Sequence, residues 1–291
     1  MKKQRKYWEN LNSYVDLRRS PRLKKRLGQF LLQDEDAAQR ISDAIPGDHL
    51  IVEIGPGDGA LTAQLLASKE RVIGCELDEE MVRRLSQRFE HRRNFRIIRG
   101  DILNLDWQSV GEKDDNIYIT GNLPYHLAST ILFNVFDMIR NEADCRIKGM
   151  VIMVQKEVGL RIAASPGKKD YSALTLLRQY HAHAEYLFTV LKESFRPVPK
   201  VDGAVIKLTF HAKDQMPVVP YQKFRRIVKS CFAQRRKMMR NSLQILSDLP
   251  VGWQELNYNF TLRPENFTFE DFIRLTQDID DLRKNEVNAN V

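Results

Sequence analysis

The chain has 291 residues, of which 43% are hydrophobic and 29% charged, as in an ordinary folded protein of one large domain or two smaller ones. It has no run of eighteen apolar residues, and its three cysteines, Cys75, Cys145 and Cys231, show no CxxC spacing, which argues against a membrane span, a zinc site and a disulfide framework. The net charge of +8 is concentrated in residues 1–26, with ten basic and two acidic side chains, and a second, acid-free basic stretch lies at 223–240. Two such zones are typical of a protein that binds a polyanion, although a charge run taken alone is more often a solvated face.

The amino-terminal segment, residues 1–26, carries positive charge but no apolar run, so it is not a secretory signal peptide. Its basic character leaves a mitochondrial transit peptide open, although its lysines and the acids Glu9 and Asp16 argue against one. The widely spaced cysteines suit a reducing compartment. We therefore expect a cytoplasmic protein.

Strand and helix patterns alternate after the basic segment. Short apolar runs predict strands at 49–55, 71–77, 95–101, 116–122 and 149–155, with helices predicted between them at 60–69, 78–90 and 127–140. This alternation predicts a doubly wound α/β fold of the Rossmann-like kind, in which helices cover both faces of a mostly parallel sheet.

The pattern changes after residue 184. Two β-like runs at 184–191 and 203–210 flank a proline-rich stretch, and we expect them to pair as a late antiparallel addition. Residues 211–220 are typical of a linker, and residues 221–291 look helical, with 223–246 as the longest predicted helix.

These patterns predict two domains. The first, residues 1–213, holds the doubly wound sheet and the basic N-terminal arm. The second, residues 214–291, is a smaller helical domain that contains the acid-free basic stretch.

The first predicted strand runs into a glycine-rich turn with the sequence EIGPGDG, residues 53–59. Gly55 and Gly57 allow the backbone to turn tightly and to approach a ligand closely. A dinucleotide site would have a third glycine at position 60, where this chain has Ala60, and this spacing disfavours an NAD-dependent oxidoreductase. The GxGxG spacing suits a cofactor without a pyrophosphate, namely S-adenosylmethionine. A purely structural turn is the alternative.

Acidic residues close the next two predicted strands. Glu76 follows Gly55 by 21 residues, about the spacing at which an acid accepts hydrogen bonds from the ribose of a nucleotide cofactor. Asp78 is the weaker candidate, because it is well placed to cap the following helix. Asp101 closes the third strand, where its carboxylate can accept the amino group of the cofactor's adenine. Because the carboxyl ends of parallel strands meet at one edge of a sheet, we expect these acids to line one site.

The most specific motif, Asn122, Leu123, Pro124 and Tyr125, ends the fourth predicted strand and resembles the Asn-Leu-Pro-Tyr motif of adenine N6-methyltransferases. An exocyclic adenine amine is a poor nucleophile, because its lone pair is delocalised into the ring. The side-chain oxygen of Asn122 and the main-chain carbonyl of Leu123 can accept its two N–H bonds and favour a pyramidal nitrogen. Pro124 fixes φ in the turn, and Tyr125 offers a face for the splayed-out base. A sulfonium is already a strong electrophile, so this chemistry needs no metal.

Together these motifs resemble the ribosomal RNA adenine N6-dimethyltransferase family over about residues 22–245. Further shared stretches are residues 24–29, 155–158, 166–168 with Tyr171, and 195–201 (FRPVPKV). The last two are specific to the family, because generic methyltransferases lack them. The resemblance implies cofactor contacts at Leu32, Gly55, Gly57, Glu76 and Asp101, with Asn122 at the junction of cofactor and target base.

The resemblance implies two successive methylations of N6 on each of two adjacent adenosines near the 3′ end of small-subunit (16S) ribosomal RNA, as part of ribosome biogenesis. One alternative is the erythromycin-resistance type, which acts on large-subunit RNA, but the leucine of the motif and the FRPVPKV stretch favour the small subunit. Another is a non-catalytic ribosome-assembly or transcription factor of the same fold. The presence of Glu76, Asp101 and Asn122 argues against that alternative.

The chain departs from the family pattern in three places. The family usually has Gly-Gln-Asn-Phe-Leu near its start, whereas this chain has Phe30 in place of that asparagine, which would contact the methionine part of the cofactor. If Phe30 has displaced a useful amide contact to the cofactor, Phe30→Asn should tighten cofactor binding. Weaker binding of this variant would show instead that the Phe30 ring has become part of the pocket wall. His126 after the Asn-Leu-Pro-Tyr motif and Gly203 after Pro-Lys-Val also differ, and we interpret His126 as loop variation.

The expected partner is ribosomal RNA, within a precursor of the small ribosomal subunit. Arg235, Arg236 and Lys237, in the acid-free stretch, are the candidate phosphate contacts. His181 and His183 have no acids at ligand spacing, so no metal is expected. We also expect no membrane contact and a monomer.

Overall fold

The structure is a computed structural model and describes residues 16–17, 21, 23–24, 28–47, 49–141 and 146–289. Its strands are β1 (Leu31–Leu32), β2 (Leu50–Ile54), β3 (Val72–Glu76), β4 (Phe95–Arg99), β5 (Ile117–Asn122), β6 (Ile147–Gln155), β7 (Ala182–Val190), β8 (Phe195–Arg196) and β9 (Gly203–Phe210). Its α-helices are α2 (Glu35–Ala44), α3 (Ala60–Ser68), α4 (Glu79–Arg88), α5 (Ala128–Asn141), α6 (Lys156–Ala163), α7 (Ala173–Gln179), α8 (Tyr221–Ala233), α9 (Met239–Leu243) and α10 (Phe269–Ala289).

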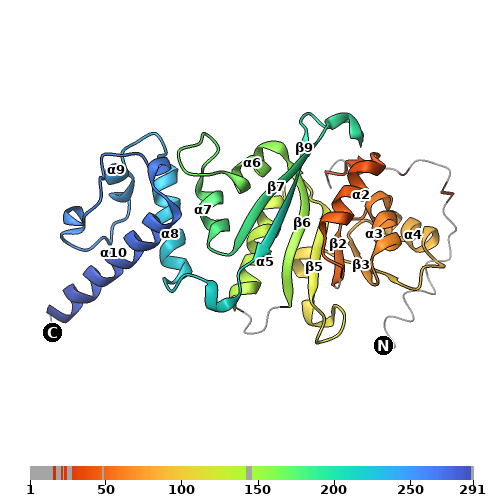
Figure 1. Cartoon of the computed structure of the whole chain (residues 1–291), viewed down its shortest axis with the longest axis horizontal. Helices are drawn as coiled ribbons and strands as arrows, with labels where there is room; N and C mark the ends of the chain where they lie inside the picture. Colours follow the sequence, from red (N-terminus) through yellow and green to blue (C-terminus); the bar gives the residue numbers. More distant parts are fainter. Residues whose placement is uncertain are drawn as a thin grey trace. The chain divides into compact units, whose positions relative to one another are not determined.

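The predicted doubly wound sheet is confirmed. In the described part of the chain, seven strands form one sheet in the order β4-β3-β2-β5-β6-β9-β7, and the pairs among β2 to β6 are parallel (Figure 1). The chain winds outward from β2 to β3 and β4, then returns to the other side of β2 with β5 and β6. The strand order therefore reverses between β2 and β5, and a crevice at such a reversal is where sheets of this kind bind ligands.

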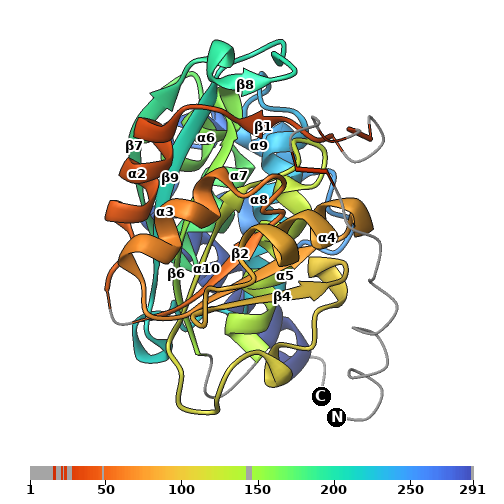
Figure 2. The ribbon, with the colours of Figure 1, turned by 90° about the vertical axis from the view of Figure 1, so that its right-hand side faces the viewer.

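The central strands are short apolar runs because both of their faces are covered. Every residue of β2 and β3 is buried, as is β5 except at its last residue. Helices α2 and α3 pack side by side next to these strands (Figures 1 and 2). This burial pattern is the one expected of a parallel sheet that is covered on both faces. Each Å² of apolar surface buried in this way stabilises the folded protein by about 25 cal/mol.

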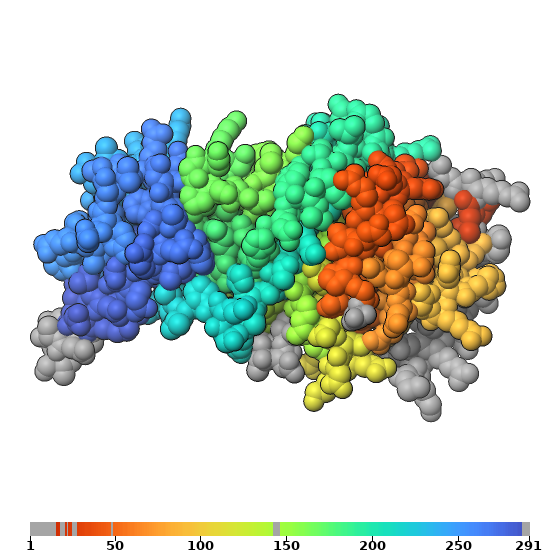
Figure 3. Space-filling model, viewed as in Figure 1, coloured from red at the N-terminus to blue at the C-terminus, as the bar shows by residue number. Residues whose placement is uncertain are grey.

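A second pairing brings together segments that are far apart in the sequence. Leu31 and Leu32 pair with Arg196 and Phe195 in a two-stranded antiparallel ribbon, and Gln33 N–H donates to the Ser194 carbonyl at 2.8 Å. In Figure 3 the surface in the teal of residues near 195 adjoins the orange-red surface of the chain that contains α2, the helix that follows β1. Strands of two residues carry no periodic pattern, so this ribbon was not predicted from sequence.

The residues group into two compact units, one with the described residues up to Lys156 plus Tyr186–Leu208, the other with Glu157–Glu185 and the described residues from Thr209 onward. The predicted division at 1–213 and 214–291 instead assigns residues 157–185 to the first domain, and it stays a prediction. No helix in the described ranges is both long enough and apolar enough to cross a membrane.

One predicted helix is wrong in its extent. The stretch 223–246 divides into α8 and α9, because Gln234 leaves the helical region with φ −122° and ψ 49°. Arg235, just past this break, donates to the Glu265 carboxylate at 2.7 Å, and Met239 is fully buried where the chain turns back. Tertiary contacts of the turn therefore override the helical pattern of the sequence.

Candidate active site

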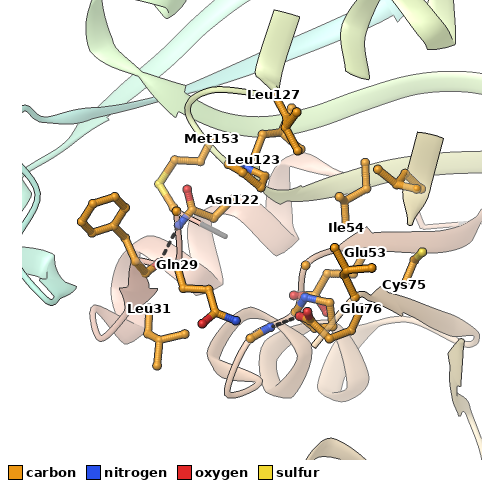
Figure 4. A pocket seen from close by; sticks show the side chains of 18 of the residues that line it. Gln29, Leu31, Glu53, Ile54, Cys75, Glu76, Asn122, Leu123, Leu127 and Met153 are labelled. Carbon is orange, nitrogen blue, oxygen red and sulfur yellow. Dashed lines mark hydrogen bonds between the residues drawn. The ribbon is translucent and has the colours of Figure 1, made fainter. Parts of the chain in front are cut away.

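One pocket collects the loops that follow the central strands. It is lined by residues from the turn after β2, the ends of β3 and β5, the start of the loop after β4 and the segment that contains β1 (Figure 4). The structure brings together here all the residues predicted for cofactor and base: Leu32, Gly55, Gly57, Glu76, Asp101, Asn122, Leu123, Pro124 and Tyr125. The pocket lies at the reversal of strand order, as the fold predicts.

The glycine turn leaves room for a ligand beside its backbone. Gly55 adopts φ +61°, a conformation that L side chains rarely adopt, and no atom lies within 4 Å of the place where its Cβ would be. Gly121 is required for another reason, because a Cβ there would lie 2.3 Å from the Ile54 carbonyl oxygen. The close approach of β5 to β2 at Gly121 places Asn122 next to the glycine turn.

Glu76 is buried at the end of β3 and is held by the main chain. One of its oxygens accepts from Asp78 N–H at 2.8 Å and the other from Gly57 N–H at 3.2 Å. Figure 4 labels Glu76 in the pocket wall. Burial raises the pKa of Glu76, while these main-chain donors oppose the shift. Each oxygen has two lone pairs, so the carboxylate keeps acceptor capacity for a ligand hydroxyl.

The two other acids at strand ends act as caps. Asp78 begins α4 by accepting from Glu80 N–H at 3.0 Å, as predicted, and also binds Lys24 at 2.6 Å and Gln29 at 3.2 Å. Burial opposes ionisation of Asp78, but the hydrogen bonds from Lys24, Glu80 and Gln29 outweigh it and lower its pKa. Asp101 accepts from Leu103 N–H at 3.0 Å with one oxygen. A cap and a ligand contact are compatible for Asp101, because its second oxygen is not used in this bond.

Asn122 presents an acceptor to the pocket. Its amide nitrogen donates to the Phe30 carbonyl at 2.8 Å, as the dashed line in Figure 4 shows. Its side-chain oxygen is buried and has no hydrogen-bond partner within the described protein. A buried, unpaired acceptor costs about 1–3 kcal/mol, so its position at a pocket wall points to a donor on a ligand.

Tyr125 is stacked on Phe30, with ring centroids 5.3 Å apart and an interplanar angle of 25°. Its hydroxyl is buried and has no partner within the described residues, and burial raises its pKa. Phe30 lines the pocket as part of its wall. Whether Phe30→Asn would tighten cofactor binding stays a prediction.

Sequence reasoning missed Glu53, which also lines the pocket. It is buried in β2 and accepts from the Thr62 hydroxyl at 2.6 Å. Burial raises its pKa to about 8, with the nearby carboxyls of Glu76 and Asp58 adding to the shift and the Thr62 hydrogen bond opposing it. The only sequence signal was an acid inside an apolar strand, which is rare unless the acid is paired or protonated.

The basic residues predicted to bind RNA lie elsewhere. Arg236 and Lys237 are exposed in the turn after α8, whereas Arg235 is half-buried and bonded to Glu265 and to the Lys168 carbonyl. Most of the basic segment 1–26 lies outside the described residues. No cluster of three or more His, Cys, Asp or Glu side chains suited to a metal ion occurs within the described ranges.

Comparisons with known proteins agree with this geometry. The family model for ribosomal RNA adenine dimethylase matches residues 21–261. A ribosomal RNA small subunit methyltransferase A from Pseudomonas fluorescens is 37% identical over 267 residues, which cover 90% of this chain and 96% of that protein.

Two solved structures share the fold. A dimethyladenosine transferase from Plasmodium falciparum aligns with a TM-score of 0.70 at 24% identity, over 87% of this chain and 98% of that one. The 23S rRNA methyltransferase ErmE aligns with a TM-score of 0.64 at 21% identity, over 86% of this chain and 99% of that one. At these identities the likeness concerns the fold alone.

Proposed function

The chain belongs to the ribosomal RNA adenine dimethylase family, and from that membership we propose that it is an S-adenosylmethionine-dependent enzyme that converts adenosine to N6,N6-dimethyladenosine in ribosomal RNA. Its target is two adjacent adenosines near the 3′ end of small-subunit (16S) RNA, and it acts on a precursor of the small subunit. The observation that carries the proposal is the unpaired Asn122 oxygen at the wall of the pocket.

The pocket fits the cofactor. Glu76 would accept the ribose hydroxyls and Asp101 the adenine amine, and their position in the pocket lining supports these roles. The open space beside Gly55 would admit the cofactor close to the backbone. Leu32 and Gly57 complete this part of the wall. When bound, S-adenosylmethionine supplies an activated methyl group on a sulfonium.

Asn122 and Leu123 prepare the target amine. Because the Asn122 amide nitrogen is bonded to the Phe30 carbonyl, the side-chain oxygen faces the ligand and accepts an adenine N–H. The Leu123 carbonyl accepts the second N–H, and the amine lone pair is then free to point at the methyl group. Leu123 itself is buried, and its own N–H donates to the Met153 carbonyl at 2.9 Å, which fixes the strand end. The rate gain comes from preorganised acceptors and positioning.

Pro124 and Tyr125 set the position of the base. The Pro124 carbonyl accepts from Leu127 N–H and Ala128 N–H, which connects the turn to α5. Tyr125 offers the ring face that is turned away from Phe30 as the stacking surface for the flipped adenine. In each transfer an N–CH3 bond would form as the S–CH3 bond of the cofactor breaks, with S-adenosylhomocysteine as the leaving group and one proton released from the amine. After the first transfer the amine has a single N–H, so positioning by Tyr125 matters more in the second methylation.

Two other functions are less well supported. An erythromycin-resistance type enzyme would share the fold, but the 37% identity is to a small-subunit methyltransferase, whereas the likeness to the 23S enzyme is 21%. A non-catalytic assembly or transcription factor would not need a buried acceptor aimed into the pocket. We further propose a monomeric cytoplasmic enzyme that binds RNA through its basic residues.

The test is methylation of defined RNA, with primer extension as readout because dimethyladenosine stops reverse transcriptase. Purified protein and S-adenosylmethionine are incubated with unmethylated small subunits or with large-subunit RNA, in parallel with the Asn122→Ala variant. The proposal expects a stop at the more 3′ of two adjacent adenosines in the small-subunit RNA with the parent protein alone, and two dimethyladenosines for each RNA by mass spectrometry of the digested product. Stops only in large-subunit RNA would support the erythromycin-resistance type, and cofactor binding without any stop would support a non-catalytic factor.

A further inference from the structure

Phe30 contacts two of the residues proposed to bind the target base. Its ring stacks on Tyr125, and its carbonyl accepts the amide of Asn122, so one residue contacts both side chains assigned to the target base. The family pattern has an asparagine at this position. The aromatic contact is therefore a property of this chain and not of the shared motif.

The segment that carries Phe30 is fixed on both sides. On one side, Gln29 accepts from Lys24 N–H at 2.8 Å and donates to the Asp78 carboxylate at 3.2 Å. On the other, Leu31 and Leu32 pair with β8. Phe30 also packs against the apolar core. A ring anchored in this way can hold a neighbour in place, because it cannot follow that neighbour's movements.

The second departure in this region lies against the same segment. A Cβ on Gly28 would lie 3.2 Å from His126 Nδ1, so the main chain at Gly28 approaches His126 closely. Residues 28–30 thus contact both residues 125 and 126 after the Asn-Leu-Pro turn. Both departures therefore lie at contacts between residues 28–30 and residues 125–126, which is consistent with a changed way of bracing the turn.

We propose that Phe30 is a positioning residue for the target adenine: its ring backs one face of Tyr125 and holds the opposite face ready to stack on the base. This inference rests on the proposed function and adds a determinant that the motif does not contain. Without the Phe30 ring, the Tyr125 side chain would adopt other orientations in a fraction of the molecules. In those molecules the target base would not be stacked productively. Phe30 acts through Tyr125 and not on the reacting atoms.

The experiment is a double-mutant cycle on kcat/KM for unmethylated small subunits. Phe30→Leu keeps an apolar side chain in the core but removes the aromatic partner, and we expect it to reduce kcat/KM by roughly 2- to 10-fold, the range of a lost aromatic pair. In a Tyr125→Leu background the same change should have no further effect, because the ring that Phe30 positions is gone. Phe30→Tyr should restore most of the parental value. S-adenosylmethionine affinity, measured by calorimetry, should change less than kcat/KM.

Phe188 provides the matched control. It is another partly buried phenylalanine packed on the same core, it lies outside the pocket lining, and its ring contacts Arg40. Phe188→Leu should lower stability to a similar extent without any coupling to Tyr125. Equal effects of Phe30→Leu in both backgrounds would overturn the proposal, as would an unchanged kcat/KM. Failure of the parent protein to methylate adenosine would instead refute the proposed function, so the two failures are distinguishable.

Discussion

Removal of the Glu76 carboxylate tests the proposed cofactor site most directly. In Glu76→Ala the ribose would lose two charge-assisted hydrogen bonds, each worth about 1.5–3 kcal/mol before water compensates part of the loss. We therefore expect cofactor binding to weaken by about 2–4 kcal/mol, or roughly 30- to 1000-fold in Kd. Calorimetric titration with S-adenosylmethionine measures this change.

The same substitution also affects the folded protein, and the two effects must be separated. Glu76 accepts the main-chain N–H groups of Gly57 and Asp78, so the alanine variant leaves two buried donors unpaired at about 1–3 kcal/mol each. A matched control is Asp115→Ala, because Asp115 is also a buried carboxylate that accepts a main-chain N–H, from Glu112, but it lies outside the pocket. This control should lose stability and retain cofactor affinity.

Titrations are made well below the melting temperature of each variant, so that both remain folded. An affinity of Glu76→Ala within twofold of the parent would refute the ribose assignment. An equal loss of affinity in Asp115→Ala would show that the measurement reports stability and not a ligand contact.

The remaining predictions concern the target base, one buried acid and the RNA. Asn122→Ala should lower the single-turnover methylation rate by about 10²–10³. Tyr125→Ala should cost about 1–3 kcal/mol of base positioning and retain cofactor affinity. Mass spectrometry of digested RNA should show monomethyl product, and dimethylation by Asn122→Ala at the parental rate would contradict the mechanism. For Glu53, the pKa of about 8 in the folded protein lies above the ordinary 4.5, so the folded state keeps a proton that the unfolded chain releases. The free energy of unfolding should therefore decrease as the pH rises from 4.5 to about 8, by on the order of 1 kcal/mol per pH unit. Urea titrations of Glu53→Gln should not show this decrease. If the free energies of parent and variant change with pH in parallel, Glu53 is ionised in the folded protein. Replacing the exposed Arg236 and Lys237 by alanine should flatten the slope of log affinity against log salt by about 1.5, and an unchanged slope would show that this turn does not contact RNA.

The sequence by itself determined the parallel strands and the chemistry at their ends. The run at 50–54 is apolar except for Glu53, because a strand covered on both faces buries every side chain, and this local signal needs no knowledge of the neighbours. Glu76 and Asn122 stand directly after such runs. Since parallel strands end at one edge of a sheet, their convergence on one pocket followed from the predicted parallel arrangement.

Only the tertiary structure decided the contacts made by segments without a periodic pattern. The stacking of Phe30 on Tyr125 joins residues 95 positions apart, and β1 pairs with β8 across an even longer separation. The break after Ala233 likewise depends on Glu265, which lies far along the chain from the turn it binds. Local propensity determines which stretches can form strands and helices, whereas such long-range contacts depend on how the whole core packs, and a pattern of neighbouring residues does not contain that information.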